Sequence, residues 1–168
     1  RFRRVLDLQH LLAAHPDSEL RCPPLLGADE EHRLLLFEWL EHAHAGNALA
    51  TDGEFTLEQA YLAGRSIGAL HRLPAAADTT SHPLPPVWAL QAIPLSMFSA
   101  LRIAELRYWA LLQQDRPLGR ALEALREQER TQVEHRPCHG DLRLDQFLYD
   151  GDRVYVLDWE EFRMADAA

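Results

Sequence analysis

The sequence of 168 residues contains no lysine, so all 17 of its basic residues are arginine. Acidic residues outnumber them at 26, and the formal net charge is −9 at pH 7. Proteins that bind nucleic acid or anionic membranes carry an excess of basic charge at the binding surface. The composition therefore predicts neither a nucleic-acid partner nor a membrane partner.

Cysteines and long hydrophobic runs are also scarce. Cys22 and Cys138 are too few for a disulfide framework and too isolated for a zinc site, which indicates a reducing, cytoplasmic location. Apolar runs such as Leu34 to Phe37 stop far short of the roughly 20 residues of a transmembrane helix. The first residues, Arg-Phe-Arg-Arg, lack the apolar stretch of a signal peptide, and the absence of an initial Met predicts that an upstream segment is missing.

The remaining composition is that of a globular domain. Hydrophobic residues make up 47% of the chain and charged residues 26%, which is enough apolar material for one core and excludes disordered and collagen-like classes. Helical spacing of apolar residues predicts a helix over Arg1 to His15 and another from Thr56, an N-cap candidate, to near Pro74. Two further helices are predicted over residues 96–114 and 118–133, with Pro117 at the join.

Strands are predicted near both ends of the chain. Residues 21–27 contain Pro23-Pro24 and read as an edge strand, and the apolar run from Arg33 to Leu40 reads as a buried strand. Residues 146–149 and 153–157 alternate β-forming side chains around an Asp-Gly-Asp turn, which is typical of a β-hairpin. The expected fold class is therefore α+β.

The most informative residues lie on either side of this hairpin. Residues 139–146 read His-Gly-Asp-Leu-Arg-Leu-Asp-Gln, and residues 156–160 read Val-Leu-Asp-Trp-Glu, so that Asp141 and Asp158 flank the two strands. Phosphoryl transfer needs a carboxylate that orients the attacking hydroxyl and oxygen ligands that hold Mg²⁺ against nucleotide phosphates. Kinase-type sequences place an amide ligand five residues after the catalytic Asp, where this chain has Gln146. The layout therefore favours phosphoryl transfer.

With these motifs the sequence resembles the aminoglycoside phosphotransferase family, the choline-kinase-like branch of the protein-kinase fold, over nearly its whole length. Residues 34–40, Leu-Leu-Leu-Phe-Glu-Trp-Leu, resemble the strand and hinge between the two lobes, and residues 69–74 resemble the first helix of the C-lobe. The resemblance implies a protein-kinase-like α+β fold. A partial N-lobe would cover residues 1–40, and a mostly helical C-lobe with the catalytic-loop hairpin would cover residues 41–168, truncated at its C-terminus.

The resemblance also implies roles for single residues. Asp141 would be the catalytic Asp, and Gln146 and Asp158 would be the ligands of Mg²⁺. His139 would brace the catalytic loop, although it could also act as a base. Arg143 would lie two residues beyond the catalytic Asp, where its guanidinium could bind phosphate or pair with a carboxylate.

The resemblance of residues 34–40 to the hinge implies the nucleotide contacts, which would be backbone groups of Glu38, Trp39 and Leu40 against the adenine of ATP, with GTP as the other candidate cofactor.

The sequence departs from the family pattern in three ways. It has Gln146 in place of Asn, Arg143 in place of His, and neither a Gly-rich phosphate loop nor the lysine that positions the α- and β-phosphates.

These features leave three hypotheses. The first is an ATP- or GTP-dependent phosphotransferase acting on a hydroxyl of an aminoglycoside-like or other small molecule, or of a peptide. The second is a pseudokinase-type module that binds a partner protein or peptide without turnover, which the missing lysine and Gly-rich loop favour. The third is an unrelated α-rich domain with coincidental motifs, which the lack of a hairpin between Asp141 and Asp158 would support.

Overall fold

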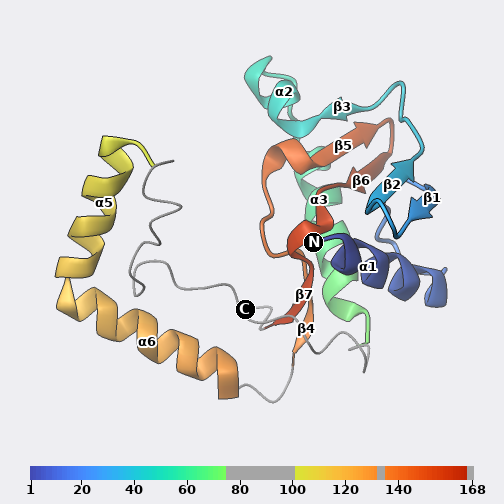
Figure 1. The fold of residues 1–168 in the computed structure, drawn as a ribbon. Coiled ribbons are helices and arrows are strands. Elements are labelled where there is room, and N and C mark those ends of the chain that lie inside the picture. The colour runs from blue at the N-terminus through green and yellow to red at the C-terminus, as the bar shows by residue number, and fades with distance from the viewer. Residues whose placement is uncertain (75–100, 132–134, 166–168) are drawn as a thin grey trace. The chain divides into compact units, whose positions relative to one another are not determined.

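The computed structural model describes residues 1–74, 101–131 and 135–165 (Figure 1). The chain divides into two compact units, one formed by Arg1–His82 together with His135–Ala168 and the other by Pro83–Glu134. Among the described residues, all of the strands belong to the first unit. The division into lobes at residue 40 stays a prediction.

The first helix, α1, covers Phe2–Ala14 and confirms the helix predicted for this segment. One face of α1 buries Val5, Leu8 and Leu11 in the core of the first unit. The same helix packs on η3, a 3₁₀ turn over Trp159–Glu161, where Arg4 donates a hydrogen bond of 2.5 Å to the Glu161 carboxylate. This contact fixes α1 beside the segment that carries Asp158.

The predicted edge and buried strands form a two-stranded hairpin of β1 (Leu25–Asp29) and β2 (Leu34–Phe37). The prediction of a buried strand is wrong for half of its side chains. Leu34 and Leu36 are each 63% exposed, because one face of the hairpin is open to solvent in the described part of the chain. The other face carries Leu35 and Phe37 against the core.

The helix predicted from Thr56 is α3, over Leu57–Arg72, and it begins with the predicted cap. The Thr56 hydroxyl accepts from the Gln59 backbone N–H, and the Gln59 side chain accepts from the Thr56 N–H, which satisfies two donors at the helix start. Before it lie β3 (His44–Ala45) and the short helix α2 (Gly46–Thr51). Helix α3 packs against two strands of the C-terminal part, β4 (Arg136–Cys138) and β6 (Arg153–Val156).

The C-terminal part of the first unit contains β4 (Arg136–Cys138), the 3₁₀ turn η2 (Leu144–Gln146), β5 (Phe147–Asp150), β6 (Arg153–Val156) and β7 (Arg163–Ala165). Strands β5 and β6 pair antiparallel from Phe147 with Val156 to Asp150 with Arg153, which confirms the predicted hairpin and counts against the α-rich hypothesis. Strand β3 extends this sheet beside β5, and β4 pairs with β7 in a separate ladder (Figure 1).

The second unit contributes α5 (Ile103–Gln114) and α6 (Arg116–Thr131), which confirm the two predicted helices, although described residues 101 and 102 precede α5 and α6 begins two residues before the predicted start. The join falls at Asp115, whose carboxylate accepts from the Leu118 N–H, and Pro117 lies in the first turn of α6, where a missing N–H costs little. Residues 96–100 and 132–133 lie outside the described residues. No described helix combines the length and the apolar character that crossing a membrane requires.

Candidate active site

A glycine and a buried histidine fix the position of the loop after β4. Gly140 has φ +93°, and a Cβ at this position would lie 2.4 Å from the Glu161 backbone oxygen, so only glycine fits. The neighbouring His139 is 4% exposed and lies on the Trp159 ring, with 4.4 Å between the ring centroids. The loop that carries Asp141 therefore lies directly against the segment after β6.

His139 joins the two segments through both ring nitrogens. Its Nε2 lies 2.7 Å from the Leu157 carbonyl oxygen and must donate, so its Nδ1 is left to accept the Asp141 backbone N–H at 3.4 Å. Burial lowers the pKa of His139, against the raising effects of the Leu157 carbonyl and of Asp158 and Asp141. Because both ring nitrogens of the neutral imidazole are hydrogen-bonded, His139 has the contacts of a residue that fixes the loop to the segment after β6.

Asp158 follows β6 in a left-handed conformation, with φ 62° and ψ 56°, which few residues other than glycine adopt. The Asp158 Oδ2 atom accepts a hydrogen bond of 2.9 Å from Gln146 Nε2. Gln146 itself is 3% exposed, and its Oε1 accepts from the Arg143 backbone N–H at 2.8 Å. The amide thus links the loop after β4 to Asp158, with its nitrogen toward the carboxylate and its oxygen toward the loop.

The hairpin brings Asp141 and Asp158 to the same cation, which is the guanidinium of Arg143. Its Nη1 lies 3.5 Å from Asp141 Oδ2, and its Nη2 lies 3.9 Å from Asp158 Oδ2. Asp145, which the sequence places on the same loop, lies 3.3 Å from Arg143 Nε. Sequence reasoning missed this third carboxylate, because nothing in the pattern shows which way a loop side chain turns.

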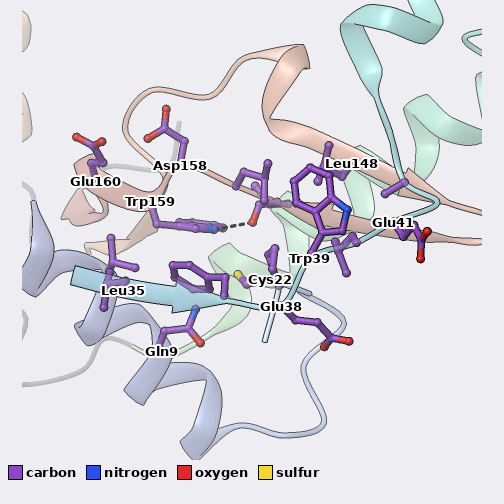
Figure 2. A pocket seen from close by; sticks show the side chains of 17 residues that line it. Gln9, Cys22, Leu35, Glu38, Trp39, Glu41, Leu148, Asp158, Trp159 and Glu160 are labelled. Atoms are coloured by element: carbon purple, nitrogen blue, oxygen red, sulfur yellow. Dashed lines mark hydrogen bonds between the residues drawn. The ribbon is translucent and has the colours of Figure 1, made fainter. Parts of the chain in front are cut away.

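A cavity of about 490 Å³ lies beside this group, between β2, the residues after it and the end of β6. Glu38, Trp39 and Leu40 line it together with Asp158, so the predicted nucleotide-contact residues and one predicted metal ligand share a cavity. Figure 2 shows Asp158 and Glu160 at one end and Trp39 and Glu41 at the other. The walls are mostly apolar, with Leu148 and Leu157 among them. His139, Asp141, Arg143 and Gln146 lie outside the lining. Gln146 and Arg143 contact it through Asp158, and His139 contacts it through Leu157 and Trp159.

Most of the lining residues were not predicted as site residues, and two of them carry polar groups that bear on the chemistry of the cavity. Gln9 of α1 is on the cavity wall, and its Nε2 is buried with no hydrogen-bond partner among the described residues. A signal was present, because Gln9 lies four residues after Val5 and falls on the apolar stripe of the helix. Cys22 also lines the cavity, and burial raises the pKa of its thiol to about 12, so the thiol is protonated and unreactive at neutral pH.

The donor chemistry fits Mg²⁺ with few protein ligands. In residues 1–74, 101–131 and 135–165 no three or more His, Cys, Asp or Glu side chains are arranged to hold a metal. Mg²⁺ commonly takes one or two carboxylates, substrate phosphates and waters, so a full protein cage is not required. The Oδ2 atom of Asp158 already faces a positive group, as such a carboxylate ligand would.

Comparison with known proteins agrees with the motifs. A model of the phosphotransferase enzyme family matches residues 1–168. Among solved structures, a choline/ethanolamine kinase family protein from Mesorhizobium loti is similar, with a TM-score of 0.50 and 17% sequence identity. The match covers 86% of this chain and 46% of that one, so the chain spans less than half the length of that protein. No curated protein matches the sequence.

Proposed function

Because the chain belongs to the phosphotransferase enzyme family, we propose that it transfers the γ-phosphoryl group of ATP or GTP to a hydroxyl group of an acceptor. The observation that carries the proposal is the convergence of Asp141 and Asp158 on one cationic group, with Asp158 at the end of a cavity that the hinge residues also line. The protein-kinase-like α+β fold supports it. We also propose a cytoplasmic location, where ATP and GTP are present.

In this proposal Asp141 orients the acceptor hydroxyl and takes its proton as the new O–P bond forms, while the bond from the γ-phosphorus to the β-phosphate oxygen breaks and ADP or GDP leaves. Its side chain is 54% exposed, so an acceptor can reach the carboxylate from solvent. Asp158 would hold Mg²⁺, which neutralises charge on the phosphates when bound. His139 keeps the loop in place and leaves proton transfer to Asp141, because both of its ring nitrogens are engaged.

The metal role of Gln146 stays a prediction. Its carbonyl oxygen accepts from the Arg143 N–H, and its NH₂ group faces Asp158, so ligation through oxygen requires the amide to turn and break both hydrogen bonds. In its present orientation Gln146 is a positioning residue that holds the Asp158 carboxylate in its left-handed backbone setting.

The nucleotide base would lie in the apolar cavity against the hinge. The Glu38 N–H donates to the Pro24 carbonyl, and the Leu40 carbonyl accepts from the Ala43 N–H, so both groups are already paired within the chain. We therefore expect the edge of the base to bind the backbone groups that lie between these two, from the Glu38 carbonyl to the Leu40 N–H. Glu38 and Leu40 would contact it through the cavity wall.

The acceptor would be a small hydroxyl compound or a Ser or Thr of a peptide. A cationic molecule such as an aminoglycoside suits the net charge of −9 and the exposed carboxylates of Asp141, Asp145 and Asp158.

The alternative function is that of a pseudokinase-type module, which binds a partner protein or peptide without turnover. It is favoured by the absence of lysine and of a Gly-rich loop from these 168 residues.

The test is Asp141→Asn, with Asp152→Asn in the exposed hairpin turn as the matched control. We follow loss of the γ-phosphate by ³¹P NMR in ATP and GTP with a panel of alcohols. Turnover should fall about 100-fold or more in Asp141→Asn while nucleotide affinity is retained, since this carboxylate acts on the hydroxyl. Unchanged turnover would remove Asp141 from the reaction. Nucleotide binding by the wild type without any turnover would support the pseudokinase alternative.

A further inference from the structure

Arg143 is surrounded by negative charge. Its three guanidinium nitrogens lie 3.3 Å from Asp145, 3.5 Å from Asp141 and 3.9 Å from Asp158. A guanidinium stays protonated at all physiological pH values, so this cation is permanent. One positive charge therefore faces three carboxylates on the catalytic loop and after β6.

One of these carboxylates, Asp158, is the group that the proposed function assigns to Mg²⁺. Its Oδ2 atom faces Arg143, so the arginine and a metal would use the same oxygen. A divalent ion bound there would stand close to the guanidinium, and the two positive charges would repel each other. Arginine and metal cannot both hold the Asp158 carboxylate at full strength.

The arginine is free to leave, because only its backbone is fixed. The Arg143 N–H donates to Gln146 Oε1 at 2.8 Å, whereas the side chain is 55% exposed. Its three partners are also 39–54% exposed, and ion pairs of this kind are weak. The guanidinium can therefore be displaced without unfolding the loop.

We propose that Arg143 is an internal counter-cation that competes with the divalent metal for Asp158, so that the metal enters only as the guanidinium moves away. The inference rests on the proposed function and adds a control of metal occupancy to it. In the absence of metal Arg143 keeps the two carboxylates together, and the same contact lowers the apparent affinity for the ion.

The experiment titrates Mn²⁺ alone into the protein and follows the free ion by EPR, without nucleotide. Arg143→Gln removes the charge and keeps the backbone N–H, and Arg153→Gln makes the same change at the start of β6, on the turn side of the hairpin. We expect Arg143→Gln to bind Mn²⁺ about 5-fold more tightly than the wild type, the effect of removing one partly screened charge beside the ion. Arg153→Gln should match the wild type, and Arg143→Lys, which keeps the charge, should stay near it.

Equal Mn²⁺ affinity in the wild type and in Arg143→Gln would overturn the role of Arg143 and leave the metal site standing. Weaker nucleotide binding by that variant, with equal Mn²⁺ affinity, would instead assign Arg143 to the phosphates. If neither protein binds Mn²⁺, the competition is wrong, because there is then no ion for the guanidinium to exclude from the nucleotide-free protein. Circular dichroism of each variant checks that its fold is kept.

Discussion

The two β-hairpins of the first unit differ in what covers them. Along β5 and β6 the residues alternate mainly between buried and half-buried, and Val156 is fully buried. Along β1 and β2 they alternate between half-buried and exposed, with Leu34 and Leu36 turned to solvent. Both hairpins contribute to the cavity, β2 through Leu35 and the other hairpin through Leu148 and Val156.

This difference in burial is the opposite of what the amino-acid composition of the strands suggests. The four residues of β2 are all apolar, whereas β5 includes an aspartate and β6 begins with an arginine. Burial follows from the neighbours that a strand finds. Helix α3 packs on β6 and strand β3 on β5, while one face of β2 stays open in the described part of the chain. A hydrophobic run therefore predicts a strand more securely than it predicts its burial.

The largest effect should come from Gly140, where the loop is pressed against the segment after the packed hairpin. Gly140→Ala places a Cβ 2.4 Å from the Glu161 oxygen at a positive φ, and we expect a loss of about 3 kcal/mol or more in the free energy of unfolding. Gly151→Ala is the matched control, because its φ is also positive but nothing lies within 4 Å, and it should cost about 1 kcal/mol. Equal losses in urea unfolding would show that the close contact is absent.

The next effect compares the two hairpins directly. Val156→Ala removes two methyl groups from a fully buried site and should destabilise the protein by about 2 kcal/mol. Leu36→Ala removes a larger side chain from a 63% exposed site and should cost about 0.5 kcal/mol or less. Chemical denaturation measures both. A loss at Leu36 as large as that at Val156 would mean that the outer face of β2 is covered in the folded protein.

A smaller effect is expected at Gln9, on the cavity wall. Gln9→Leu removes the buried Nε2 that lacks a partner, so the ligand-free protein should gain about 1 kcal/mol. If a nucleotide supplies the missing acceptor, its affinity should fall in the same variant. Thermal unfolding with and without nucleotide measures the two changes. Destabilisation of the ligand-free protein would show that the amide is already satisfied.

The smallest effect concerns pH. The pKa of His139 is lowered by burial, so between its folded value and about pH 6.5, the ordinary value, the unfolded chain binds a proton that the folded protein does not. Stability from this residue is therefore present above about pH 6.5 and declines as the pH falls below it. His139→Gln should weaken the decline between pH 7.5 and 5.5 in urea unfolding. An unchanged pH dependence would contradict the buried neutral ring.

Much of the fold could be predicted because local signals agreed with tertiary contacts. The apolar stripe of α1, the Thr56 cap of α3 and the Asp-Gly-Asp turn between β5 and β6 each act within a few residues of chain. The order of motifs also indicated the family, which the match over residues 1–168 confirms. The burial of β2 could not be predicted, because it depends on what packs on its outer face.

The residues of the candidate site could be predicted from the sequence better than the contacts between them. The spacing of Asp141 and Asp158 around the hairpin was readable, since strand pairing brings the two ends of a hairpin together. The direction of the Gln146 amide and the turn of Asp145 toward Arg143 were not, because side-chain hydrogen bonds depend on loop conformation. Those contacts led to the competition proposed for Arg143.

The most direct test of the central claim measures thermal unfolding with ATP or GTP, with and without Mg²⁺, in the wild type and in Asp158→Ala. Magnesium should increase the stabilisation by nucleotide in the wild type, and this increase should disappear in the variant, because Asp158 would hold the ion at the cavity. Asp152→Ala, in the hairpin turn, should behave like the wild type. A magnesium-dependent shift of equal size in Asp158→Ala would contradict the claim.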